Sequence, residues 1–304
     1  MATFSKTQVD KLGDRLRSGS TTEADLRDLH DYRKSFAAAY ERSAHRIRQE
    51  FDLEPTGRPS KSTSSIVEKL QRESVRLSQI QDIAGCRLVV DDIDSQDAVV
   101  GRLARVFSGA RVIDRRNQPS HGYRAVHVIV DIDDKSIEIL VRTMLQHLWA
   151  ELSEKLSDFV DPMVEYGGGS EVVRDILDWT TQFVSRAEFE KQADDTTDLE
   201  VRARRSARKR EFERFIRELN ALFPKAKDDR SAGRLIELRR FEDSERQRAD
   251  EARLELELRL HRRGLKHEVV VLDASGEDAL HRTHRRYFAE DLAGLANASE
   301  ADRR

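Results

Sequence analysis

Side chains suited to phosphate chemistry lie between residues 58 and 142 of this chain. Two carboxylates, Asp82 and Glu138, share this stretch with several cations. The cations Arg58, Lys61, Lys69 and Arg72 precede Asp82 in the sequence. Carboxylate oxygens are ligands that Mg²⁺ prefers, and Lys and Arg neutralise phosphate oxygens. Because phosphoryl-type transfer needs mainly positioning and charge stabilisation, the combination predicts a site for a Mg²⁺–nucleoside triphosphate.

Two pairs of polar side chains, each four residues apart, lie in strand-like segments. Tyr123 and His127 occur in HGYRAVH, and Glu138 and Arg142 occur in SIEILVRT. Since successive side chains of a strand alternate between its faces, each pair shares a face. The opposite face of the second segment carries Ile137, Ile139 and Val141. We expect this aliphatic face in the core and the polar face, with Leu140, toward a ligand or solvent. Solvation is the ordinary explanation for any one of these charges, but their joint occurrence favours a site.

The elements that must position these side chains follow from residue patterns. Short segments rich in β-branched residues predict four strands, CRLVVDDI, ARVIDRR, AVHVIVDI and SIEILVRT, the last two forming a hairpin across DDK. The spacing predicts helices over SQDAVVGRLARVF and over 22–51, 65–78, 144–159, 171–219, 234–263 and 276–288. A loop is expected over 52–65 and a further strand over 267–274. We expect one domain over 1–165 and a helical, charged region over 166–304.

Composition limits the classes of protein. Hydrophobic residues make up 38% and charged residues 37% of 304, with a formal net charge of −3, so the surface is not globally basic. A single cysteine, Cys86, excludes a disulfide within the chain and a Cys-rich zinc site. No apolar run reaches the roughly 18 residues of a membrane helix. Residues 1–14 lack the apolar core of a signal peptide, so we expect a cytoplasmic protein without a membrane segment.

The segment from about 58 to 158 resembles the synthetase domain of the RelA/SpoT family, including the small alarmone synthetases. The motifs that carry the resemblance are KSTSSIVEKLQR, QDIAGCR, HGYRAVH, and IEILVRT followed by QHLWAELSEK. Several motifs in order are specific, whereas one alone would be weak. The resemblance implies an α+β fold with a nucleotidyltransferase-like mixed sheet flanked by helices, followed by the mostly helical C-terminal region.

The resemblance also implies an activity, transfer of the β,γ-diphosphate of ATP to the 3′-hydroxyl of GDP or GTP. The product would be a (p)ppGpp-type alarmone. Mg²⁺ would be held by Asp82 and Glu138, and Glu138 would also help to deprotonate the acceptor hydroxyl. The implied catalytic residues are Asp82, Glu138, Tyr123, His127 and Arg142. The implied ATP-binding residues are Arg58, Lys61, Lys69, Arg72 and Arg87. The implied acceptor-binding residues are Tyr123, His121 and Arg124.

The chain departs from the family pattern at several places. Pro59 stands where the family carries an arginine two residues before Lys61, and Arg58 lies one residue further back. Leu140 replaces the glutamine of the Glu-x-Gln-x-Arg strand, and the loop RNQPSH lacks the lysine found in many alarmone synthetases. Both of these changes fall where an acceptor nucleotide would be recognised. They leave open a toxin that pyrophosphorylates the 3′ end of tRNA or adenine nucleotides, with the basic stretch Arg202–Arg210 contacting RNA.

Two further readings concern the remainder of the chain. A degenerate site acting as a nucleotide sensor is the non-enzymatic alternative, against which the presence of Asp82, Tyr123 and Glu138 argues. The segment EVVVLDASGEDALHRTHRRYF resembles the C-terminal part of toxin-like members such as the CapRel group. In that group this part can fold back and restrain the synthetase. In the present chain we expect Tyr287 and Phe288 to be either helix anchors or a plug for the active site. Association into a homo-oligomer is left open.

Overall fold

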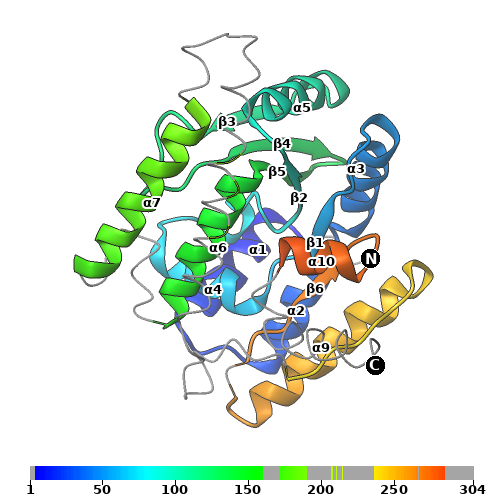
Figure 1. Ribbon diagram of the computed structural model, residues 1–304. Helices are drawn as coiled ribbons and strands as arrows, with labels where there is room; N and C mark the ends of the chain where they lie inside the picture. The colour runs from blue at the N-terminus through cyan, green and yellow to red at the C-terminus, as the bar shows by residue number, and fades with distance from the viewer. Residues whose placement is uncertain are drawn as a thin grey trace, which may run out of the picture.

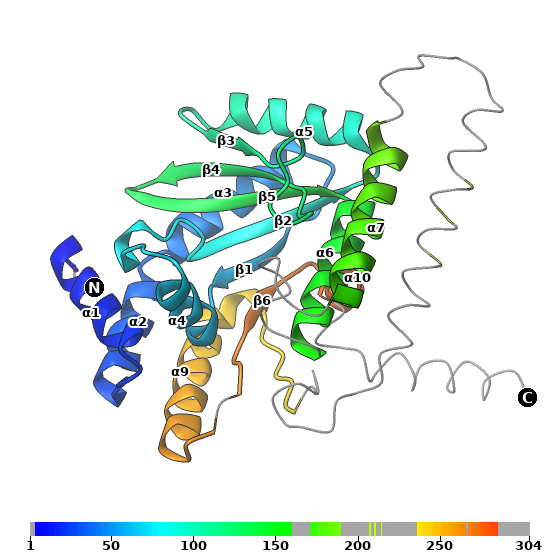
Figure 2. The same ribbon diagram turned by 90° about the vertical axis from the view of Figure 1, so that its left-hand side faces the viewer.

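The computed structural model describes residues 4–159, 171–189 and 236–284 except 266, together with residues 207, 210 and 214. These residues form a six-stranded mixed sheet in the order β3-β4-β5-β2-β1-β6 (Figures 1 and 2). The strands are β1 (Thr56–Ser60), β2 (Ala84–Val90), β3 (Arg111–Asp114), β4 (Val126–Ile132), β5 (Lys135–Thr143) and β6 (Val271–Asp273). Of the paired strands, β2 and β5 run parallel and the other neighbours run antiparallel. The predicted α+β class is confirmed, and the four predicted strands are β2, β3, β4 and β5.

Helices cover the sheet and extend beyond its edge. The helices are α1 (Lys6–Arg17), α2 (Glu23–Lys34), α3 (Ala37–Glu50), α4 (Thr63–Arg72), α5 (Ile93–Val106), α6 (Met144–Phe159), α7 (Glu171–Phe189), α9 (Arg246–Arg262) and α10 (Glu277–Thr283). Short 3₁₀ turns lie at Leu77–Gln79 and Asp243–Glu245. None of the helices in the described part is long and apolar enough to span a bilayer.

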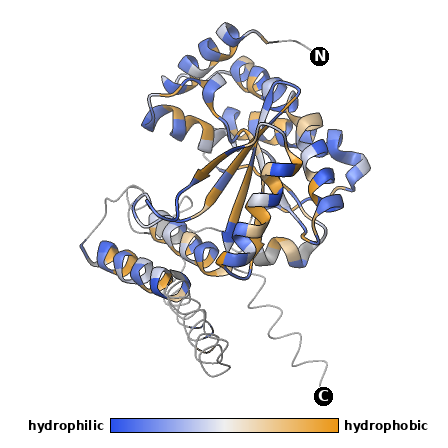
Figure 3. Ribbon diagram, turned by 90° about the horizontal axis from the view of Figure 1, so that it is seen from above, coloured by the Kyte–Doolittle hydropathy of each residue, from blue (hydrophilic) through white to orange (hydrophobic). Residues whose placement is uncertain are grey.

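The main core lies on one face of the sheet. Aliphatic side chains of β2, β4 and β5 pack there against α3 and α5, together with residues of α1, α2 and α4. Ile137, Ile139 and Val141 are fully buried in this core, which confirms the predicted alternation along β5. A smaller core joins α6 to α7 around Trp149 and Leu177. In Figure 3 hydrophobic residues follow the central strands, whereas the outward helix surfaces are largely hydrophilic.

The helix predicted over residues 22–51 is wrong in one respect, because it is broken into α2 and α3. The Ser35 side chain donates to the Tyr32 carbonyl oxygen at 2.6 Å, and Phe36 begins the next helix without a side-chain cap. The rings of Tyr32 and Phe36 meet edge to face with centroids 5.3 Å apart. Both rings are buried, so the break lets two helices pack aromatic residues into one core.

The loop predicted over residues 52–65 is also wrong in its centre, where β1 forms. Gly and Pro are local signals for a loop, but pairing with β2 and β6 on both sides overrides them. Gly57 is required by a close approach, since a Cβ there would lie 1.4 Å from the Tyr40 hydroxyl oxygen. That hydroxyl donates to the Asp273 carboxylate of β6 at 2.8 Å. The register shift in the β1–β6 pairing spans Pro59, which cannot donate a backbone hydrogen bond.

Several other elements are shorter than the sequence predicts. The helix predicted over 65–78 begins earlier and ends at Arg72, and residues 236–242 are not helical although helix was expected from 234. The strand expected over 267–274 is limited to β6. Residues 190–206 and 285–304 lie outside the described residues. The basic stretch Arg202–Arg210 and the pair Tyr287 and Phe288 therefore fall wholly or mostly there.

The described residues 236–284 of the C-terminal segment pack against the sheet and the N-terminal helices. β6 extends the sheet beyond β1, α9 packs against α2, and α10 lies beside β1 (Figures 1 and 2). A division of the chain near residue 165 remains a prediction, and one strand of the region that follows it lies in this sheet.

Candidate active site

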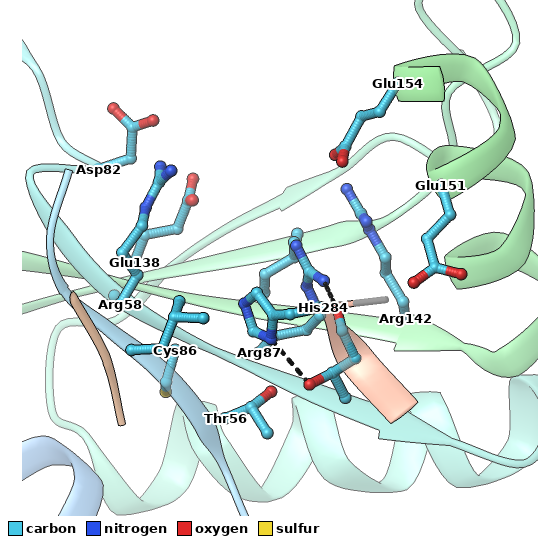
Figure 4. A pocket seen from close by; sticks show the side chains of 14 residues that line it. Thr56, Arg58, Asp82, Cys86, Arg87, Glu138, Arg142, Glu151, Glu154 and His284 are labelled. Carbon is cyan, nitrogen blue, oxygen red and sulfur yellow. Dashed lines mark hydrogen bonds between the residues drawn. The ribbon is translucent and has the colours of Figure 1, made fainter. Parts of the chain in front are cut away.

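A pocket of about 180 Å³ opens on the face of the sheet opposite the main core. β1, β2 and β5 form its floor, α6 forms one wall, and β6 and α10 close another side (Figure 4). Its lining residues are Thr56, Arg58, Asp82, Gly85, Cys86, Arg87, Glu138, Leu140, Arg142, Glu151, Glu154, Leu272, Thr283 and His284. Five of the predicted site residues, Arg58, Asp82, Arg87, Glu138 and Arg142, are thereby brought to one cavity.

Parallel pairing of β2 with β5 places the polar residues on the pocket floor. Glu138 is paired with Gly85, and Leu140 is paired with Arg87. Paired residues of adjacent strands point to the same face, so the pocket receives one polar row from each strand. A Cβ on Gly85 would lie only 2.4 Å from the Glu138 carbonyl oxygen, which explains why glycine stands at this crossing.

Asp82 is held by two lysines at one end of the pocket. Its Oδ2 lies 2.5 Å from Lys61 Nζ, and its Oδ1 lies 3.0 Å from Lys69 Nζ. Burial alone would raise the pKa of Asp82, but the two ammonium groups outweigh it and hold that pKa well below its usual range. Burial and the neighbouring cations Arg58 and Lys69 lower the pKa of Lys61. Three cations facing one carboxylate leave an excess of positive charge, which suits a polyphosphate.

A directed chain of hydrogen bonds ends on Glu138. Arg142 donates to the Tyr123 hydroxyl oxygen at 2.9 Å, and that hydroxyl lies 3.1 Å from His127 Nε2. His127 Nδ1 lies 2.9 Å from Glu138 Oε1. Since Arg can only donate, a neutral His127 with its proton on Nδ1 satisfies every link. The Arg142 guanidinium also lies 4.9 Å from the Tyr123 ring centroid. This chain orients the Glu138 carboxylate toward the pocket.

Two arginines, the half-buried Arg87 and the buried Arg142, lie between the Asp82 end and the α6 wall. Arg87 donates to the Thr283 carbonyl oxygen of α10 at 2.6 Å. Burial, assisted by the nearby Arg142, lowers the pKa of Arg87 to about 10. Figure 4 shows Arg87 and Arg142 side by side, with His284 next to Arg87 and Arg58 near Asp82 and Glu138. The Nε atoms of Arg87 and Arg142 are buried without a hydrogen-bond acceptor, which is the state expected of donors awaiting a ligand.

Seven predicted residues do not line the pocket. Lys61 and Lys69 contact Asp82, and Tyr123 and His127 belong to the hydrogen-bonded chain that ends on Glu138.

The other three predicted residues are Arg72, Arg124 and His121. Arg72 lies at the end of α4 and contacts the neighbouring Glu73 at 3.2 Å. Arg124 donates to the Arg116 carbonyl oxygen, and His121 takes a left-handed conformation with φ of 51° in the loop before β4. Their roles in binding ATP or the acceptor remain predictions.

The sequence analysis missed other lining residues. Glu151 and Glu154 are three apart on α6, a spacing that places both on one helix face and was available as a signal. Thr283 ends α10 and His284 follows it. Both lie in the segment that resembles the C-terminal part of the CapRel group, but the sequence analysis did not name them as site residues.

The carboxylates fit a Mg²⁺ ion bound together with substrate. Asp82 and Glu138 both face the pocket, and no group of three or more His, Cys, Asp or Glu that could hold a metal occurs among the described residues. Mg²⁺ is usually bound by one or two carboxylates, with waters and substrate phosphates as its other ligands. Two carboxylates beside a cluster of cations match that pattern.

Comparison with known proteins agrees with the motifs. Residues 57–157 match the family profile described as the region found in RelA / SpoT proteins. Uncharacterised proteins of Mycobacterium tuberculosis and Mycobacterium bovis are each 36% identical over 111 residues, covering 35% of this chain. The chain spans 41% of the length of these curated relatives. Residues 57–157 therefore match the region that RelA and SpoT proteins share, which confirms the resemblance for this part of the chain.

Two solved structures are also similar to parts of this chain. The small alarmone synthetase 1 from Bacillus subtilis is 22% identical, covering 56% of this chain and 94% of its own, with a TM-score of 0.40. A chain from the complex between the type VI effector Tas1 and its immunity protein is 17% identical to this one. The match covers 65% of this chain and 99% of that chain, with a TM-score of 0.34.

Proposed function

We propose that the chain is a pyrophosphokinase that transfers the β,γ-diphosphate of ATP to the 3′-hydroxyl of GDP or GTP. The observation that carries the proposal is the joining of two groups at one pocket. One is Asp82 with its two lysines, and the other is Glu138 at the end of its hydrogen-bonded chain. The RelA/SpoT match over residues 57–157 supports the same reaction. The cytoplasm, where ATP and guanosine nucleotides occur together, is the proposed compartment.

In the proposed reaction the 3′-oxygen of the acceptor attacks the β-phosphorus of ATP. The bond between that phosphorus and the oxygen bridging to the α-phosphate breaks, so AMP leaves and the acceptor gains a diphosphate. The hydroxyl proton passes to Glu138, whose orientation His127 fixes. Lys61 and Lys69 bind the ATP phosphates, while Arg58 and Arg87 contact the adenine. Mg²⁺, held by Asp82 and Glu138, would neutralise charge on the phosphates.

Tyr123 is the proposed platform for the acceptor base. Its hydroxyl is fixed by Arg142 and His127, so its ring is held rigidly beside the β5 row. Preorganised aromatic rings bind flat bases at little cost in conformational entropy.

A different acceptor is the second candidate, and Leu140 is the observation that favours it. Leu140 lines the pocket between Glu138 and Arg142 and offers no polar group to a guanine. The 3′ end of tRNA or an adenine nucleotide would then accept the diphosphate.

ATP labelled at the γ-phosphate distinguishes the acceptors when GDP, GTP, ATP and bulk tRNA are offered in parallel with Mg²⁺. Label on a guanosine nucleotide, with equimolar AMP, supports the first candidate; label on tRNA or on adenine nucleotides alone refutes it. No AMP release with any acceptor refutes both and favours a nucleotide sensor.

We further propose that α10 restrains the site. Thr283 and His284 line the pocket, and the Thr283 carbonyl oxygen accepts a hydrogen bond from Arg87. The remaining 180 Å³ is below the roughly 300–1,000 Å³ usual for small-molecule sites. Ala279→Glu places a charge at a buried position of α10 and should unseat the helix, whereas Asp278→Asn alters its exposed neighbour. A lower KM for ATP in the first variant alone supports the restraint, and equal KM values refute it.

A further inference from the structure

A buried ion pair between α2 and α9 contacts the backbone of Lys61. Arg33 donates to the Lys61 carbonyl oxygen at 3.1 Å and to Thr63 Oγ1 at 3.1 Å. The other nitrogen of the same guanidinium lies 2.7 Å from Glu257 Oε2. The side chains of Arg33 and Glu257 are 0% and 6% exposed, so the pair is removed from water. Arg33 thus donates one hydrogen bond to the backbone of Lys61, whose side chain contacts Asp82, and one to Thr63 nearby.

Side chains from the C-terminal segment hold the residues on either side of Lys61. Arg253 of α9 donates to the Ser60 hydroxyl, and Glu257 accepts from Thr63 Oγ1 at 2.7 Å. Glu268, which precedes β6, accepts from the Ser62 hydroxyl at 2.8 Å. Residues 60–63, which we call the donor loop, are therefore contacted one after another by α2, α9 and the chain before β6. On its other side, the Lys61 amide of this loop donates a hydrogen bond of 2.7 Å to the carbonyl oxygen of Ile83, the residue before β2.

Stability alone gives no reason for this arrangement. Burying two charges costs desolvation that their attraction only roughly offsets, and apolar residues of similar volume commonly serve as well. What the ion pair adds is direction, since the planar Arg33 fork fixes both the Lys61 carbonyl and the Thr63 hydroxyl. A displacement of about 1 Å in a group that orients substrate can cost roughly a hundredfold in rate.

We propose that Arg33 and Glu257 are positioning residues that hold the donor loop in its phosphate-binding conformation. The inference rests on the proposed transfer from ATP. It gives α9 a role opposite to that of α10: α9 supports the ATP site, and α10 restrains it. Neither residue touches the substrate, so the effect of changing them passes through Lys61.

The test compares full-length variants. Glu257→Gln keeps the shape of the side chain and removes its charge, while Arg262→Gln breaks an exposed pair of the same two helices, at 2.8 Å to Glu23. Because Glu257→Gln leaves a buried unpaired cation and lowers stability, a double variant, Arg33→Met with Glu257→Met, removes both charges and should restore the melting temperature. Steady-state kinetics, melting temperature and amide hydrogen exchange at residues 60–65 are measured for each.

The proposal predicts a rise of about tenfold in KM for ATP with kcat changed less than about threefold, since saturating ATP draws the loop back into place. Exchange at residues 60–65 should quicken in Glu257→Gln and remain unchanged in Arg262→Gln. The double variant should regain its melting temperature but keep the raised KM. If KM recovers together with the melting temperature, the pair is merely structural and the proposal is wrong. If the wild type transfers nothing, the proposed function fails, and exchange still decides whether the pair orders the loop.

Discussion

Replacing Asp82 by Asn separates the two tasks that its carboxylate performs. The carboxylate neutralises Lys61 and Lys69 in the free protein, and in the proposed reaction it binds Mg²⁺. Asn has the same shape without the charge. The variant should therefore lose turnover while its lysines become more available to phosphate, an outcome that a simple loss of structure would not produce.

The expected magnitudes follow from the burial of the three side chains. Breaking a fully buried ion pair costs about 3–5 kcal/mol. The side chains of Lys61, Lys69 and Asp82 keep 11%, 25% and 18% exposure, so solvent screening reduces the cost. We expect a loss of about 1–3 kcal/mol, which for a chain of this size lowers the melting temperature by roughly 2–10 °C. Because the pKa of Asp82 is lowered, this difference is fully present at neutral pH. It is lost only as pH falls below about 4, toward the folded pKa.

Two assays check the reasoning. Release of AMP from ATP with Mg²⁺ and GDP should fall at least about a hundredfold, the usual cost of one charge-stabilising group. Calorimetric binding of inorganic tripolyphosphate in EDTA should strengthen by about tenfold, because no carboxylate competes for the lysines; this corresponds to about 1.4 kcal/mol. Asp97→Asn, which breaks an exposed pair to Arg116, is the control for loss of one negative charge. Turnover within tenfold of wild type, or tripolyphosphate binding that weakens with turnover, would refute the account.

Three further changes test two residues of the site and one buried residue of α7, Glu188, which accepts hydrogen bonds from Thr143 and Gln146. Tyr123→Phe removes the hydroxyl between Arg142 and His127, so kcat should fall about 10–100-fold with a stability loss near 1 kcal/mol, measured by kinetics and urea unfolding. Leu140→Gln adds a polar group to the floor and should shift acceptor preference toward guanosine nucleotides in competition assays; an unchanged ratio contradicts it. Burial raises the pKa of Glu188, so wild-type stability should decline as pH rises from about 4.5 toward the folded pKa. Glu188→Gln should remove that decline in unfolding measured between pH 5 and pH 8.

The sequence predicted the central sheet because its strands carry strong local signals. The aliphatic alternation of β5 placed Glu138 and Arg142 on one face, and the DDK turn paired β4 with β5. β1 was missed because Gly57 and Pro59 favour a loop locally. Its strand pairing depends on contacts with Tyr40 and β6, which are distant in the sequence. Tertiary contacts of this kind cannot be predicted from the pattern of a few neighbouring residues.

The same reasoning explains which side chains of the site were found. Asp82, Glu138 and the lysines occur in recognisable motifs, so the sequence predicts that they lie at one site. The link between Tyr123 and Arg142 depends on the path of the loop before β4, where Gly122 adopts a φ of 88°. Contacts from α9 and α10 arise in a segment whose charged, repetitive composition fits many helix packings equally well.

The contacts of α10 allow its strength as a restraint to be bounded. Arg87 gives it one charge-assisted hydrogen bond, worth about 1.5–3 kcal/mol, and Ala279 gives it a small buried side chain. A bias of this size leaves the open state at about 1–10% of molecules, so the apparent affinity for ATP falls by about 10–100-fold. Millimolar ATP could overcome such a bias, so α10 would set a threshold rather than abolish activity. The wild type should accordingly differ from Ala279→Glu in KM by that factor while sharing its kcat, and a difference confined to kcat would show that α10 acts on the reacting groups instead.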